Sequence, residues 1–136
     1  MLNRRFLRIK VMQMLYSYYQ HENADMAAFE KELFKSLDKV YSLYLYVLAL
    51  FTDIHHVSYM IVDENKNKRL PAAEDLNPNL KFVNNQLLVA LSESQPLKKE
   101  LEKQKISWQE NFDIVRKLYT EIRNTEAYKN YMSVEG

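Results

Sequence analysis

The scarcity of glycine and proline constrains this chain more than any other feature of its sequence. It has one glycine and three prolines in 136 residues. Sheets joined by tight turns use both residues often, because glycine supplies positive φ angles and proline presets turn geometry. No segment alternates convincingly between apolar and polar residues. We therefore expect an all-α fold, a helical bundle of about six to seven helices.

Composition indicates an ordinary soluble domain. The chain is 47% hydrophobic and 27% charged, and its length suffices for a core without metal or disulfide. The absence of cysteine excludes a disulfide scaffold and fits a reducing cytoplasm. The longest apolar stretch, residues 40–51, is shorter than the roughly 20 residues that span a bilayer. We expect a cytoplasmic protein with no membrane partner.

Capping residues predict where the first helices begin. Asn3 precedes a helix over residues 4–20, and Asp25 precedes a second helical pattern that extends to about residue 65. That pattern is long for one globular helix, so we expect a break at residues 36–39. Residues 40–51 are apolar on several sides, which predicts that they are central and buried.

The second half of the chain carries further helix signals. Residues 65–79 form a polar loop, and Asn77 followed by Pro78 predicts a helix start at its end. We expect Ser94-Gln95-Pro96 to restart the chain into a short helix and Ser107 with Glu110 to form a capping box. Asn124-Thr125 is expected to interrupt before a last short helix.

The first twenty residues hold four bases and no acid, namely Arg4, Arg5, Arg8 and Lys10. Cations at a helix N-terminus oppose the helix dipole, so a bound anion would explain them. Arg4 and Arg8 lie one turn apart and Arg5 flanks them, while Tyr16 lies near the azimuth of Arg5. Arginine beside aromatic rings suits single-stranded RNA, whose bases stack and whose phosphates pair. An acidic protein partner, or a purely solubilising role, is the alternative.

Catalytic signals are absent from the sequence. There is no glycine-rich phosphate loop, no nucleophile motif and no His/Cys cluster. His55 and His56 are adjacent, so on a helix they diverge by about 100° and do not share a metal easily. A solvated or core-edge role is expected for them. We therefore expect a protein that is not an enzyme and that needs no cofactor and no metal.

Two short motifs in the first helix carry a resemblance to a known family. Arg4-Arg5-x-x-Arg8 followed by Gln13-x-Leu15-Tyr16-Ser17 resembles the opening helix of the NusB family of transcription antitermination factors. The resemblance implies an all-helical RNA-binding protein of transcription regulation that recognises boxA-type RNA together with the ribosomal protein NusE. It assigns RNA binding to Arg4, Arg5, Arg8, Lys10 and Tyr16. The ring of Tyr16 is expected to pack on neighbouring helices.

The resemblance covers residues 1–65, which we interpret as a NusB-like N-terminal subdomain. Residues 66–136 are interpreted as a helical insertion, with the family's C-terminal half absent. A missing half would leave apolar surface uncovered, so a homodimer is a possible consequence. Two other interpretations stay open: a helical protein-interaction module, and the NusB-like RNA-binding domain of an RNA-modifying enzyme.

Overall fold

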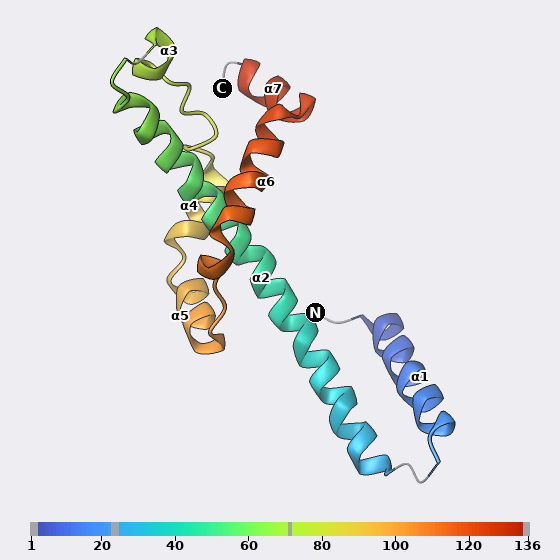
Figure 1. Ribbon diagram of the computed structural model, residues 1–136. Coiled ribbons are helices and arrows are strands. Elements are labelled where there is room, and N and C mark those ends of the chain that lie inside the picture. Colours follow the sequence, from blue (N-terminus) through green and yellow to red (C-terminus); the bar gives the residue numbers. More distant parts are fainter. Residues whose placement is uncertain (1–2, 23–24, 71, 135–136) are drawn as a thin grey trace. The chain divides into compact units, whose positions relative to one another are not determined.

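The computed structural model describes residues 3–22, 25–70 and 72–134, and every regular element in them is helical (Figure 1). The expected all-α class is therefore confirmed. The elements are α1 (Arg4–Gln20), α2 (Met26–Lys66), α3 (Ala73–Leu76), α4 (Gln86–Glu93), α5 (Gln95–Gln104), the 3₁₀ turn η1 (Gln109–Asn111), α6 (Phe112–Asn124) and α7 (Glu126–Ser133).

Side-chain caps define several of the helix starts that the sequence predicts. The Oδ1 atom of Asn3 accepts hydrogen bonds from the N–H groups of Arg5 at 2.7 Å and Phe6 at 3.1 Å. Asp25 caps α2 through the N–H of Ala27, and Ser94 and Thr125 cap α5 and α7. The caps expected at Asn3 and Asp25 are confirmed, and so are the helix starts expected near residues 94 and 125. All four caps depend only on atoms within three residues along the chain.

The expected break at residues 36–39 is wrong. α2 is one continuous helix of 41 residues. Ser36 lies inside it and donates its hydroxyl to the carbonyl oxygen of Leu33 at 2.8 Å, so this polar side chain is satisfied without interrupting the helix. No glycine or proline lies in the segment, and nothing else there opposes helical geometry.

The expected helix start at Asn77 and Pro78 is also wrong. Asn77 ends the short α3, and the next helix begins only at Gln86, where the side chain of Asn85 accepts from two backbone N–H groups. Asn79 holds the intervening segment as a turn. Its Oδ1 atom accepts from the N–H of Lys81, and its Nδ2 donates to the carbonyl of Met132. That second bond is tertiary, so the local sequence does not reveal it.

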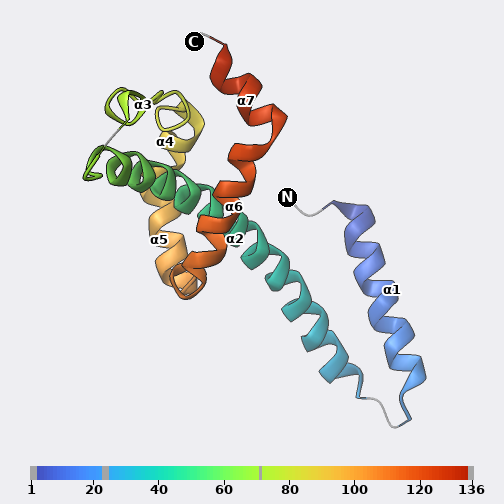
Figure 2. The same ribbon diagram turned by 45° about the horizontal axis from the view of Figure 1, so that its top comes forward.

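The chain divides into two compact units, residues 1–44 and 45–136. The boundary lies inside α2, not at residue 65, where the resemblance divides the chain. The first unit consists of α1 and the beginning of α2, which run antiparallel in both views of the ribbon (Figure 2). The division implied by the resemblance concerns family membership and stays a prediction.

The hydrophobic core lies in the second unit and has two clusters. Residues from α2, α5 and the chain after it form one cluster, and residues from α2 and α6 form the other. Their buried members are Leu45, Ala49, Leu97 and Ile106 in the first, and Ile54, Val57, Val115 and Tyr119 in the second. Trp108 packs against both clusters and joins them.

The expected burial of residues 40–51 holds for only two of them. Leu45 and Ala49 are buried, whereas six large side chains of this stretch are exposed: Tyr41, Leu43, Tyr44, Tyr46, Val47 and Phe51. The prediction was wrong because apolar residues surround the helix here on more sides than its neighbours cover.

Because α2 is uninterrupted, the apolar residues 40–51 are part of a helix that is long enough to span a bilayer. Among the described residues, it is the one helix long and apolar enough to cross a membrane, with an 18-residue window of mean hydropathy 1.4. Core helices of soluble proteins meet the same criterion, and α2 supplies Ile54 and Val57 to the core. The feature is therefore weak evidence for a membrane segment.

Candidate nucleic-acid interface

The candidate interface is built on α1. Its first turn is closed by Asn3, whose side chain accepts from the N–H groups of Arg5 and Phe6 and whose carbonyl accepts from the N–H of Leu7. The N–H groups of Arg5, Phe6 and Leu7 are therefore not free for an anion. Anion binding at this end would depend on the guanidinium groups.

Arg4, Arg5 and Arg8 are all exposed on α1. Within the part of the chain that the structure describes, none of the three forms an ion pair. Positions 4 and 8 lie one helical turn apart, and position 5 flanks them. The structure thus brings the three arginines together as one exposed cationic group, which we call the arginine cluster.

Lys10 does not join the arginine cluster. It is half-buried, its Nζ atom lies 5.7 Å from the centre of the Phe6 ring, and it lines a groove between α1 and α2. Position 10 is turned well away from positions 4, 5 and 8 on a helix of 3.6 residues per turn. The structure therefore separates Lys10 from the other predicted RNA contacts.

Tyr16 lies on the outward side of α1. Its side chain is 69% exposed, so the expected packing of its ring on neighbouring helices is wrong. Positions 5, 12 and 16 share nearly one azimuth, and Arg5 and Tyr16 are about 16 Å apart along the helix. Met12 between them is 67% exposed. The outward side of α1 is therefore a row that begins with arginine and continues with a thioether and a phenol ring.

Acidic side chains do not neutralise this row. No acid lies in α1, and the first described acids after it are Glu22 and Asp25, at the opposite end of the helix from the arginines. Further along α2, Glu32 pairs with Lys35 at 2.6 Å, and this bond lowers the pKa of the Glu32 carboxyl below its usual value. The cationic end of α1 keeps its charge available to a ligand.

The histidines of the second unit have structural surroundings. The Nε2 atom of His55 lies 2.8 Å from the carbonyl oxygen of Val83, and its Nδ1 atom lies 2.9 Å from the hydroxyl of Ser92. His55 is half-buried and His56 is exposed, as expected for a core-edge and a solvated residue. Among the described residues, no group of three His, Asp or Glu side chains could hold a metal ion.

A cavity in the second unit was not predicted from the sequence. Its volume is about 530 Å³. Phe82, Tyr119 and Tyr128 form an aromatic wall, with the Phe82 ring 5.6 Å and 5.3 Å from the other two. Burial, together with a hydrogen bond to Tyr128, raises the pKa of Tyr119. Only folding brings these rings together, since they come from three separate segments.

Comparison with known proteins assigns no family to this arrangement. No family model, no curated protein and no solved structure matches the chain.

Proposed function

We propose that this protein binds single-stranded RNA through the outward side of α1 and is not an enzyme. The observation that carries the proposal is the arginine cluster, three exposed guanidinium groups without an ion pair in the described part of the chain. Guanidinium groups form paired hydrogen bonds with phosphate oxygens. Their position costs the helix some dipole energy, which a bound phosphate would offset.

The neighbouring side chains support RNA as the polyanion. Tyr16 and Tyr19 are 69% and 80% exposed, and exposed aromatic rings on a cationic surface let unpaired bases stack. A duplex would offer no free base faces to these rings. The arrangement therefore favours an unpaired strand, with phosphates at the arginine cluster and bases further along α1.

A finer proposal rests on the resemblance of residues 4–17 to the NusB opening helix. In that case the RNA is of the boxA type, the ribosomal protein NusE completes the binding surface, and the process is transcription antitermination in the cytoplasm. Arg4, Arg5, Arg8 and Tyr16 would contact RNA. Lys10, which lies in the groove beside Phe6, would not contact the RNA and would contribute only long-range electrostatic attraction.

The test is a titration of a short fluorescent single-stranded RNA at several salt concentrations. Each phosphate contact contributes roughly 0.7 to the logarithmic salt slope on single strands. Replacing Arg4, Arg5 and Arg8 by alanine should therefore lower the slope by about 2 and weaken binding at low salt.

A charge-matched control is available in the second unit. Lys98, Lys99 and Lys117 are exposed, and replacing all three by alanine removes the same net charge without touching α1. This variant should retain the slope of the parent protein. An unchanged slope in the arginine variant, or an equal loss in both variants, contradicts the proposal.

The finer proposal needs a second titration. With NusE present, the parent protein should bind a boxA-type RNA more tightly than a scrambled RNA of equal length. Equal affinity for both RNAs would leave general RNA binding intact and exclude the boxA assignment. Capture of NusE without any RNA affinity would instead support the helical protein-interaction module.

A further inference from the structure

The first unit has helices but no core of its own. No described residue of α1 is buried, and the buried residues of α2 begin only at Leu45. Isolated helices of this length are marginal in water, and most helix stability in proteins comes from burying an apolar face. The pair formed by α1 and residues 26–44 of α2, here called the hairpin, therefore needs a further surface to bury.

The contact between the two helices of the hairpin defines which way their other side chains face. Met14 of α1 and Leu33 of α2 line the groove between them, and the Tyr18 and Phe29 rings meet edge to face, 5.6 Å apart. The two helices are right-handed and antiparallel (Figure 2). On each helix, residues that lie a quarter turn past the contact, in the direction of rising residue number, therefore face the same side of the hairpin.

That side of the hairpin is mostly apolar, with exposed Arg4 and Arg8 at one end of its stripe on α1 and exposed Glu30 on its stripe on α2. From α1 it carries Val11, Leu15 and Tyr19, and from α2 it carries Met26, Phe34, Leu37 and Tyr44. Exposed fractions reach 58% for Phe34, 59% for Tyr44 and 80% for Tyr19. The opposite side is polar, with Gln13 and Ser17 on α1 and Lys35 and Lys39 on α2. We call the side that carries Val11, Leu15 and Tyr19 the apolar side.

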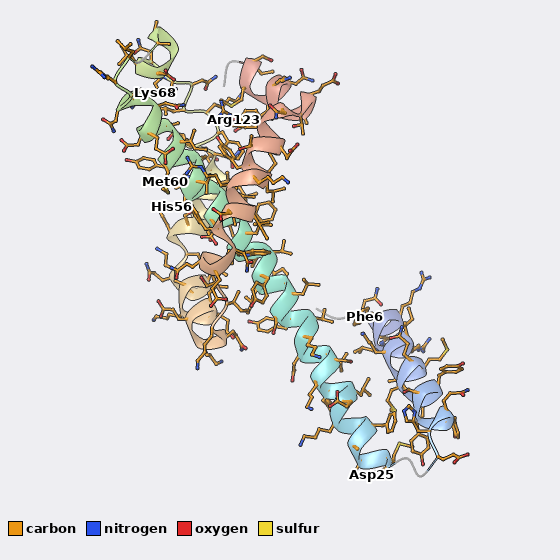
Figure 3. All side chains as sticks on the ribbon, in the orientation of Figure 1. Phe6, Asp25, His56, Met60, Lys68 and Arg123 are labelled. Carbon is orange, nitrogen blue, oxygen red and sulfur yellow. The ribbon has the colours of Figure 1, made fainter. Side chains whose placement is uncertain are left out.

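Charge is also unevenly distributed along the hairpin. The arginine cluster lies at its open end, whereas Glu22, Asp25 and Glu30 lie toward the connection between the helices. Figure 3 labels Phe6 near the open end and Asp25 near the connection. A second hairpin in the reversed direction would bring the basic end of each copy level with the acidic end of the other. A second hairpin in the same direction would place like charges together.

We propose that two copies of this chain pair through the apolar sides of their hairpins, in antiparallel orientation, to form a four-helix bundle. A two-fold axis across the hairpin places α1 against α1 and α2 against α2 of the second copy. Such an interface is self-complementary. Arg5, Met12 and Tyr16 point away from α2 and remain outside this interface, whereas Arg4, Arg8 and Tyr19 lie on the stripe of α1 that faces it. Dimerisation does not require that the protein binds RNA, because the apolar contacts and the paired charges of the two copies are sufficient reasons for it.

The available area indicates a weak dimer. A helix of 17 residues is roughly 25 Å long and two helices side by side are about 20 Å wide, so each copy offers about 500 Å² in projection. Two copies together reach the lower range of specific interfaces, near 1,000 Å². The dimer should therefore dissociate on dilution, with a mass that depends on protein concentration.

Sedimentation over a wide concentration range tests the proposal. The parent protein should pass from monomer to dimer, and the pair Tyr19→Glu and Phe34→Glu should stay monomeric with unchanged helix content. Gln13→Glu with Gln20→Glu adds the same charge elsewhere on α1 and should dimerise like the parent. A parent that is monomeric throughout, or a Tyr19/Phe34 variant that still dimerises, overturns the proposal.

Cysteine cross-linking tests the relative orientation of the two hairpins. The natural chain has no cysteine, so each introduced thiol is the only one in its copy. Val11 lies near the middle of α1, so Val11→Cys places two thiols close to the two-fold axis and should give a covalent dimer on mild oxidation. Tyr19→Cys lies far from the axis and should not cross-link. The reverse pattern excludes the antiparallel bundle. Binding of the parent to neutral phosphatidylcholine vesicles without dimer formation would assign the apolar side to a lipid surface instead.

Discussion

The indole N–H of Trp108 donates a hydrogen bond to the carbonyl oxygen of Tyr46 at 2.9 Å, and the two rings meet edge to face with their centres 5.9 Å apart. The two residues are 62 positions apart in sequence. This contact attaches the chain between α5 and η1 to α2, and it places the Trp108 ring where both core clusters meet.

Trp108→Phe should lower the free energy of unfolding by about 1 kcal/mol or more, because the hydrogen bond from the indole to the carbonyl of Tyr46 is lost and the smaller ring leaves space between the clusters. Urea unfolding followed by circular dichroism measures the change. Tyr46→Phe is the matched control, since it keeps both the backbone carbonyl and the ring contact. Equal stability of the Trp108 variant and the parent would show that the bond contributes nothing.

Tyr16→Asp should change stability by no more than about 0.5 kcal/mol, because the ring is 69% exposed and loses little packing. Sequence reasoning alone predicts a much larger cost, about 2–4 kcal/mol, from a ring packed between helices. Thermal melts of the variant distinguish the two. Leu33→Asp, in the groove between α1 and α2, should loosen the hairpin and serves as the positive control.

Replacing Arg4, Arg5 and Arg8 by alanine should leave stability unchanged or raise it slightly. The three charges lie at the positive end of the α1 dipole, where each cation destabilises the helix by about 0.3 kcal/mol or more. Helix content and melting temperature at low salt measure the effect. A marked loss of helix would mean that the arginines stabilise α1 through contacts of their own.

Asp53 should make the stability of the second unit depend on pH. Burial raises the pKa of its carboxyl, and the nearby charge of His56 opposes the shift only partly. The folded state therefore holds the proton more tightly than the unfolded state. This contribution to stability is complete below the ordinary pKa near 3.9 and is lost as the pH rises through the folded value.

Asp53→Asn removes that dependence, so the variant should gain stability relative to the parent between acid and neutral pH. Urea unfolding of both proteins, at one acid pH and at neutral pH, measures the difference in their free energies of unfolding. Glu110→Gln, at an exposed position, should show no comparable gain. An Asp53 variant that loses relative stability as the pH rises would contradict the sign of the pKa shift.

Part of the candidate interface could be predicted from the sequence. The run of Arg4, Arg5 and Arg8 and its position on a helix follow from residue spacing alone, and the structure places the three side chains together. The position of Lys10 and the exposure of Tyr16 did not follow. Both depend on which side of α1 contacts α2, and a helix that is apolar nearly all round does not reveal that side.

The sequence by itself determined the helical class and the capped starts at Asn3, Asp25, Ser94 and Thr125, because these depend on glycine and proline content and on hydrogen bonds between near neighbours. Tertiary structure alone decided that α2 continues through residues 36–39 and that Asn79 holds a turn by bonding to Met132. It also decided which apolar residues are buried. Burial depends on the surfaces that cover a helix, and those come from distant parts of the chain.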